Sequence, residues 1–142
     1  MPLPSRRLRD WQSRLAALVQ ERMAMPFAWG WHDCCLFAAD AVLAVTGHDP
    51  AADLRGTYAT AAQAAAVLER AGGLAGVAIE RAGRVMPTAA AQPGDIGVLE
   101  PGRGGLPALA VCMGAHWLAP GRDGLASHPA ARVRRAWRCT SD

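Results

Sequence analysis

Apolar positions in the first half of the chain recur at the three- and four-residue steps of helices. Residues 5–23 place leucines and a tryptophan on one stripe with arginines opposite, which predicts a first, amphipathic helix that Ser5 caps and Pro26 ends. Residues 34–45 are apolar except for Asp40. They therefore predict a second helix that lies buried at the centre of the fold.

The next segment carries the signals of a third helix. Thr60 is an N-cap residue and Gln63 stands three positions later, which is the spacing of a capping box, while the glycines at 72–73 end the helix. Asp40 is a charge within an otherwise apolar helix. We expect it to face an edge of the core or to pair with an arginine such as Arg55.

From position 77 onward the side chains follow the two-residue period of strands. The predicted strands are a short one at Val77 and Ile79, then residues 96–99, 106–113, 115–119 and 132–139. Turns are predicted at 93–95 and 102–105, and Gly114 separates the two strands of a hairpin. Strand 106–113 is apolar on both faces, so we expect it at the centre of the sheet. Helices followed by antiparallel strands predict an α+β fold.

Composition is typical of a globular chain of one domain. The 142 residues are 51% hydrophobic and 19% charged, which is enough apolar side chain for a core. All 15 basic residues are arginine, they gather near both ends of the sequence, and the net charge is +3. No array of aromatic side chains accompanies them, so a solvated face or an acidic protein partner is favoured over nucleic-acid binding.

Several kinds of segment and site are missing from the sequence. No run of about 18 apolar residues could span a membrane, and the arginine-rich start lacks the apolar core of a signal peptide. The cysteines are Cys34, Cys35, Cys112 and Cys139, and their spacing is not that of zinc ligands. We therefore expect no metal, no cofactor and reduced thiols.

A stretch just before the central helix has the order of a catalytic-cysteine turn. Trp29, Gly30 and Trp31 form a compact aromatic turn, Asp33 is a suitable N-cap, and Cys34 begins the apolar helix. A thiol in the first turn of a helix lies among unpaired backbone N–H groups at the positive end of the dipole, and both favour the thiolate. The alternative is that Cys34 is a small apolar core residue, as free cysteines commonly are.

Taken in order, these features resemble the NlpC-type cell-wall peptidases, the papain-like cysteine hydrolases of bacteria and phages. The matching features are Trp29-Gly30, Asp33-Cys34, Phe37, Gly47, the turn Pro93-Gly94-Asp95 and the strand that ends at Gly114. A closer resemblance is to small proteins of tailed-phage genomes, which share a Gly-x-Asp-Pro loop at 47–50 and Arg-Gly-x-Tyr at 55–58. The resemblance implies a single papain-like domain over residues 27–142, with the amphipathic helix of residues 1–26 in front of it.

The resemblance also implies a Cys-His-polar triad in which Cys34 is the nucleophile. The family's histidine position falls on Ala108 and its polar third position falls on Leu118, so both partners are apolar here. A thiol without an imidazole cannot pass a proton to a leaving amine, and losing that base removes several orders of magnitude of rate. His116 remains a candidate base if the alignment shifts by two residues, and His32 is a candidate because it precedes Cys34 closely.

The other histidines and the aromatic residues have structural explanations. His48 is expected in a turn and His128 in a loop. Trp29 and Trp31 are expected to pack against the central helix, because aromatic side chains account for much of a core. Lining a substrate cleft is the alternative role for these two tryptophans.

Two functions are expected from this reading. The first is a structural or assembly component of the tail tip or baseplate of a long-tailed phage, built on an inactive peptidase fold. Such a protein would be made in the host cytoplasm, reside in the virion tail, and have other tail-tip and hub proteins as partners. The second is an active cysteine peptidase or amidase that cleaves peptidoglycan with Cys34 as nucleophile, His116 or His32 as base, and helix N–H groups as the oxyanion hole.

Overall fold

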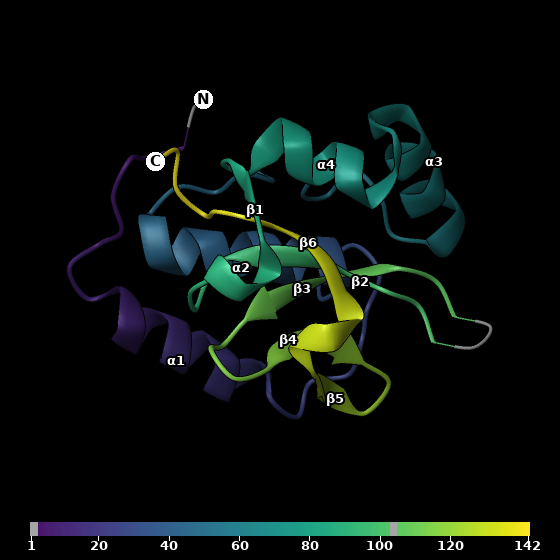
Figure 1. Ribbon diagram of the computed structural model, residues 1–142. Helices are drawn as coiled ribbons and strands as arrows, with labels where there is room; N and C mark the ends of the chain where they lie inside the picture. Colours follow the sequence, from purple (N-terminus) through teal and green to yellow (C-terminus); the bar gives the residue numbers. More distant parts are fainter. Residues whose placement is uncertain (1–2, 103–104) are drawn as a thin grey trace.

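The computed structural model describes residues 3–102 and 105–142 and has an α+β architecture. Within that part of the chain four helices precede or flank a sheet of six strands (Figure 1). The helices are α1 (Trp11–Arg22), α2 (Cys34–Thr46), α3 (Ala61–Ala71) and α4 (Gly73–Arg81), with short 3₁₀ turns η1 (Thr88–Ala90) and η2 (Ala130–Arg132). The strands are β1 (Val85–Met86), β2 (Ile96–Leu99), β3 (Ala108–Cys112), β4 (Trp117–Gly121), β5 (Gly124–His128) and β6 (Val133–Trp137).

The sheet has the order β1-β6-β2-β3-β4-β5, and each neighbouring pair is antiparallel. The strand predicted at 96–99 is confirmed with its bounds, and β3 lies inside the sheet, between β2 and β4, as its apolar faces predicted. The strand predicted at 132–139 corresponds to β6, which lies between β1 and β2 in the sheet and pairs with both. The turn predicted at 102–105 includes residues 103–104, which lie outside the described residues.

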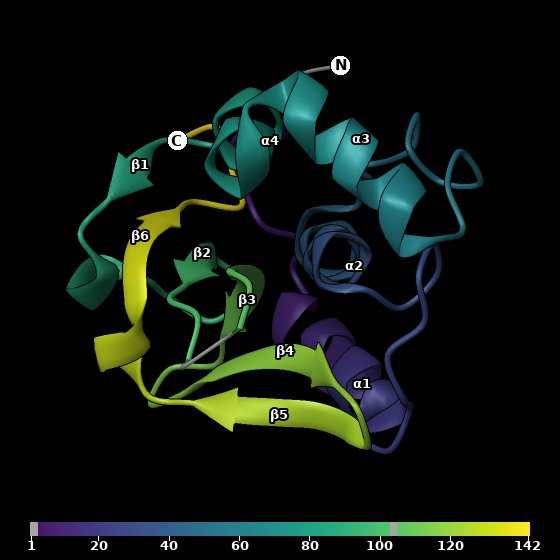
Figure 2. The ribbon, with the colours of Figure 1, turned by 90° about the vertical axis from the view of Figure 1, so that its right-hand side faces the viewer.

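Helix α2 is the buried centre of the molecule, as its sequence predicted. Phe37, Ala41 and Val45 have no exposed surface. Figure 2 views α2 end-on, with α1 on one side, α3 and α4 on the other, and the sheet beside it. One core cluster joins α2 to α1, α4 and strands β2, β3, β4 and β6. Burying each large apolar side chain in such a core contributes roughly 1.5–3 kcal/mol, so α2 organises most of the packing energy.

The predicted N-caps of α2 and α3 and the predicted ion pair of Asp40 are confirmed, whereas Ser5 does not cap a helix. The Asp33 carboxylate accepts the N–H of Leu36 at 2.9 Å, and the Thr60 hydroxyl accepts the N–H of Gln63 at 3.2 Å. The Asp40 carboxylate lies 2.6 Å from a guanidinium nitrogen of Arg55. These local interactions fix where α2 and α3 begin and hold the loop between them against α2.

The first helix begins later than predicted, at Trp11 instead of just after Ser5. The preceding segment consists of bends and a turn, and it is held by the N–H of Leu8, which bonds the carbonyl of Val45 at 2.8 Å, and by Arg7, which bonds the carbonyl of Pro93. Asp10 stands at the N-cap position without a side-chain cap bond. Contacts with the end of α2 therefore override the helical periodicity of these first residues.

The strand predicted at Val77 and Ile79 is wrong, because both residues belong to α4. Leu74, Val77 and Ala78 are buried at helical spacing, whereas Ile79 is 63% exposed. Gly76 permits this tight helix pair, since a Cβ there would lie 1.8 Å from the carbonyl oxygen of Ala71. Val77 therefore belongs to the buried stripe of this helix, and Ile79 lies on its exposed face.

Candidate functional site

The turn before α2 is built around the carboxylate of Asp33, which is 1% exposed. One oxygen accepts the Leu36 N–H, and the other accepts the Gly30 N–H at 2.9 Å and the Tyr58 hydroxyl at 2.6 Å. Gly30 has φ +79°, and a Cβ at this position would lie 2.2 Å from the carbonyl oxygen of Tyr58. Glycine is therefore required at position 30, both by its positive φ and by the close approach of the Tyr58 carbonyl. Burial, followed by the bond to Asp33, raises the pKa of Tyr58.

Cys34 occupies the first position of α2, where the sequence placed it. Hydrogen bonding from the Cys35 side chain, and less strongly from the backbone of Leu109, lowers the pKa of Cys34, although burial opposes this. The same contact, together with burial, raises the pKa of Cys35. Cys34 is therefore the reactive member of the pair and Cys35 stays a neutral donor.

Both cysteines line a groove of about 570 Å³ between the start of α2, helices α3 and α4, and the beginning of β3. Its other lining residues are predominantly apolar and include Phe27, Trp29, Leu68, Leu106, Ala108 and Pro120. Phe27 and Trp29 stack edge to face with ring centroids 4.6 Å apart. The groove thus surrounds the nucleophilic sulfur with hydrocarbon.

The two positions that the resemblance assigns to the rest of a triad do not supply a base. Ala108 lines the groove beside Cys34. Leu118 is buried in the core and pairs with Val111 in the β3–β4 ladder. Two residues further along β4, Pro120 reaches the groove. The side chains available to Cys34 from β3 and β4 are therefore apolar.

Neither candidate histidine lines the groove. His116 is exposed in the turn before β4, where its carbonyl accepts the N–H of Met113 at 2.8 Å. That turn follows the far end of β3, whereas Cys34 contacts Leu109 near the beginning of the strand. At about 3.3 Å per residue, the length of β3 separates them. The two-residue shift in alignment therefore does not bring His116 to the sulfur.

His32 is fully buried and is engaged elsewhere. Its Nδ1 lies 3.1 Å from a guanidinium nitrogen of Arg22, and its ring meets Phe37 edge to face. Arg22 in turn pairs with Asp40 at 2.9 Å. Burial, followed by the charge of Arg22, lowers the pKa of His32. His32 is a neutral packing residue between α1 and α2.

This environment predicts that the protein loses stability as the pH falls from about 7 to about 5. The unfolded chain binds a proton at the ordinary histidine pKa of 6.5, whereas folded His32 binds it only at lower pH. The unfolded state therefore holds more protons in this window, and the free energy of unfolding rises with pH. Urea titrations across the window should give a smaller slope for His32→Gln than for wild type.

The matched control for that experiment is His116→Gln, which changes an exposed turn residue. His128 contributes a slope of the same sign, because burial and then Arg132 lower its pKa. The slope in His32→Gln should therefore be reduced and not abolished. An unchanged slope in His32→Gln would contradict the role of His32.

The remaining sequence expectations are resolved as follows. His48 lies in the loop after α2, as predicted, but His128 ends β5 and pairs with Trp117, so its loop assignment is wrong. Trp29 and Trp31 are 40% and 54% exposed, so neither is a core residue as expected. Trp29 lines the groove, which is the alternative role named for it, and the Trp31 ring lies 5.6 Å from the guanidinium of Arg22.

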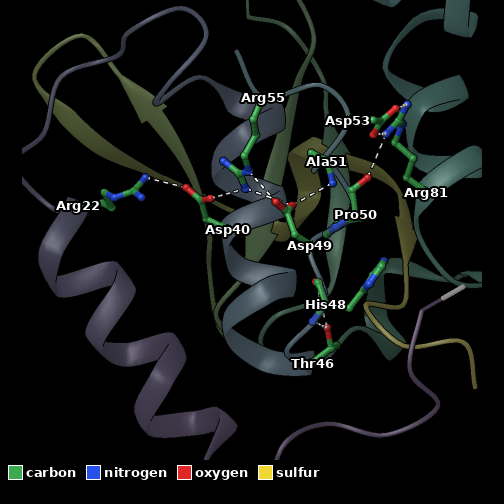
Figure 3. Close-up of polar contacts among 10 residues, drawn as sticks. All are labelled: Arg22, Asp40, Thr46, His48, Asp49, Pro50, Ala51, Asp53, Arg55 and Arg81. Atoms are coloured by element: carbon green, nitrogen blue, oxygen red, sulfur yellow. Dashed lines mark hydrogen bonds and ion pairs between the residues drawn. The ribbon is translucent and has the colours of Figure 1, made fainter. Parts of the chain in front are cut away.

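A network of ion pairs and hydrogen bonds connects α2 with the loop that follows it (Figure 3). The Asp40 carboxylate lies between Arg22 and Arg55, and Arg55 also holds Asp49 at 2.7 Å. Arg81 of α4 bonds the carbonyl of Pro50 at 3.0 Å and pairs with Asp53. These pairs connect α1, α2, α4 and the 47–58 loop, and sequence reasoning found only the Asp40–Arg55 contact.

The described residues contain no group of three histidine, cysteine or acidic side chains placed to hold a metal ion. Within the same residues, no helix has the length and apolar content needed to cross a membrane.

The ionisation of Cys34 predicts selective alkylation. At about neutral pH, iodoacetamide should modify Cys34 before the other thiols, because the thiolate is the reacting species. Burial raises the pKa of Cys112 and raises that of Cys139 to about 12, and both side chains are enclosed. Peptide mapping by mass spectrometry over time checks the order. Equal labelling rates at the three positions would contradict it.

Comparisons with known proteins place the chain in a family. The model of a domain of unknown function, DUF6950, matches residues 6–139. No curated protein and no solved structure matches the chain. Because the family model spans all four helices and the six-stranded sheet, the chain belongs to the DUF6950 family.

Proposed function

We propose that this protein is a non-catalytic component of the tail tip or baseplate of a long-tailed bacteriophage, built on an NlpC-type papain-like fold. Its role is structural or in tail assembly, its place is the virion tail after synthesis in the host cytoplasm, and its partners are other tail-tip and hub proteins. The likeness to tailed-phage proteins rests on Trp29-Gly30, Asp33-Cys34 and the motifs at 47–50 and 55–58.

The arrangement of elements supports the papain-like part of the proposal. Cys34 begins the buried helix α2, and this helix packs on the antiparallel sheet. The cysteine lies next to Leu109, near the start of the central strand β3. This is the layout that the NlpC resemblance implies. The shared motifs also have structural roles here, since Asp33, Gly30 and Tyr58 meet in one hydrogen-bonded turn and Asp49 meets Arg55.

One observation argues for a non-catalytic role: the groove at Cys34 is lined from β3 and β4 by Ala108 and Pro120, and neither side chain can act as a base. The polar position of the triad falls on Leu118, which is buried in the core. Amide hydrolysis by a thiol requires a proton donor for the leaving nitrogen. His32 is instead packed against Arg22, and His116 lies past the far end of β3. The site can hold a thiolate without being able to complete peptide cleavage.

Deletion and complementation of the gene in its phage genome tests the proposal. We expect the deletion to yield particles with defective tails in electron micrographs. A copy that encodes Cys34→Ala should restore them as well as wild type, because assembly depends on the folded surface and not on the sulfur. Normal particles from the deletion would contradict a tail role, and failure of Cys34→Ala with normal folding would contradict the non-catalytic role.

The alternative function is a peptidoglycan-cleaving cysteine peptidase, and the lowered pKa of Cys34 is the observation that favours it. Purified peptidoglycan incubated with wild type and with Cys34→Ala separates the two. We expect no release of stem-peptide fragments that depends on Cys34. Fragments released by wild type and absent with Cys34→Ala would establish the peptidase and overturn our preference.

A further inference from the structure

Cys34 and Cys35 form a pair of adjacent thiols that the proposed function leaves unused. They occupy the first two positions of α2, and both line the apolar groove. Because the two residues are consecutive and both line this groove, both thiols are available to the same ligand. The pKa of the Cys34 thiol is lowered and that of the Cys35 thiol is raised, so Cys34 is the more acidic of the two.

The surroundings of this pair do not complete a coordination shell for a metal ion. A structural zinc site needs four ligands, and the described residues hold no group of three metal-binding side chains. Asp33 is the nearest acidic neighbour in sequence, but its two oxygens already accept from Leu36, Gly30 and Tyr58. The pair offers two soft sulfur ligands and nothing further.

We propose that Cys34 and Cys35 are a dithiol binding site for trivalent organoarsenic compounds. Such a compound is soft and thiophilic, needs only two sulfur ligands, and carries its own carbon substituent as the third. The groove beside the sulfurs is lined by Phe27, Leu68 and Leu106 among other apolar side chains and receives that substituent. The ligand thus uses both the sulfur pair and the hydrocarbon around it.

The reaction is a condensation without a change of oxidation state. The Cys34 thiolate attacks arsenic first, and the Cys35 thiol forms the second arsenic–sulfur bond as it loses its proton. The arsenic–oxygen bonds of the oxide break, and the oxygen leaves as water with the proton from Cys35 and one proton from solvent. The second bond forms within the same molecule, so the two thiols together bind about 10²-fold or more tightly than either alone.

Phenylarsine oxide is the probe that tests this site. The full-length protein is mixed with an equimolar amount, washed with excess 2-mercaptoethanol, and measured by intact-mass spectrometry. We expect one phenylarsenic group per chain that survives the monothiol and is released by 2,3-dimercaptopropanol. Trypsin should place the group on the peptide between Arg22 and Arg55, which contains Cys34 and Cys35 and no other cysteine.

Single serine substitutions give the matched controls, with folding checked by circular dichroism. Cys34→Ser and Cys35→Ser should each lose the adduct in the monothiol wash, whereas Cys139→Ser should retain it. Absence of the adduct from wild type, its appearance on a peptide that contains Cys112 or Cys139, or its retention by Cys35→Ser would each overturn the proposal. Peptide mapping of wild type decides the question even if a variant fails to fold.

Discussion

Replacing Asp95 by alanine is expected to lower the free energy of unfolding by about 3–5 kcal/mol, measured by urea denaturation. The carboxylate is 1% exposed and accepts the N–H groups of Gln92 and Cys139, both at 2.9 Å, and a guanidinium nitrogen of Arg7 at 3.3 Å. Its removal leaves these donors, one of them charged, without their acceptor in the interior. The beginning of β2 also loses its connection to both ends of the described chain.

Asp53→Ala is the matched control for Asp95→Ala. Asp53 also pairs with an arginine, Arg81, but its side chain is 66% exposed, so solvent screens the pair. We expect the loss of this exposed pair to change stability by about 1 kcal/mol or less. If Asp95→Ala lowered the free energy of unfolding no more than Asp53→Ala does, the bonds from the Asp95 carboxylate to Arg7 and Cys139 would not contribute to stability as argued.

Replacing Asp33 by alanine should lower the free energy of unfolding by about 3 kcal/mol. Loss of the helix cap accounts for about 1 kcal/mol, and leaving the buried Tyr58 hydroxyl without an acceptor costs roughly 1–3 kcal/mol more. The Gly30 N–H loses its acceptor as well. Thermal unfolding followed by circular dichroism, together with urea titration, measures the effect.

Two further variants separate the contributions of the cap and of the buried phenol. Tyr58→Phe removes the hydroxyl and leaves the Asp33 cap of α2 in place, so a loss of about 1 kcal/mol is expected. Thr60→Ala removes a single cap bond at an exposed helix end, and a loss of about 1 kcal/mol is expected there too. An Asp33→Ala loss no larger than either would show that the three bonds to its carboxylate do not act together.

The sequence predicted those parts of the fold whose signals are local. Asp33 and Thr60 each accept the backbone N–H of the residue three positions later, and the sequence predicted both of these N-caps. The apolar character of β3, and of α2 apart from Asp40, correctly predicted that both lie in the interior. Strands β1 and β5 were missed, because β1 has only two residues and β5 is an edge strand that begins at a glycine. These two segments are strands because they pair with β6 and β4, and their own sequences carry no two-residue period.

The candidate site was predictable up to the position of its sulfur. The helix-capping turn placed Cys34 at the start of α2, but the donors to its sulfur include Leu109, which comes from a strand distant in sequence. The motif at 55–58 gave no partner for Tyr58, because its bond to Asp33 spans 25 residues. The position of the turn that carries Trp29 and Trp31 depends on the close approach of Gly30 to the carbonyl of Tyr58. These contacts join residues that are far apart in the sequence, so no local sequence pattern could predict them.

The carboxylate of Asp95 has a consequence for the order in which the molecule can form. One of its donors, Cys139, follows it by 44 residues, and another, Arg7, precedes it by 88. On a ribosome, β2 and β3 are synthesised before position 139. Closing contacts over such long separations is entropically unfavourable until the intervening structure has formed. We infer that this buried negative charge stays partly hydrated through most of synthesis and that its enclosure is among the last steps of folding.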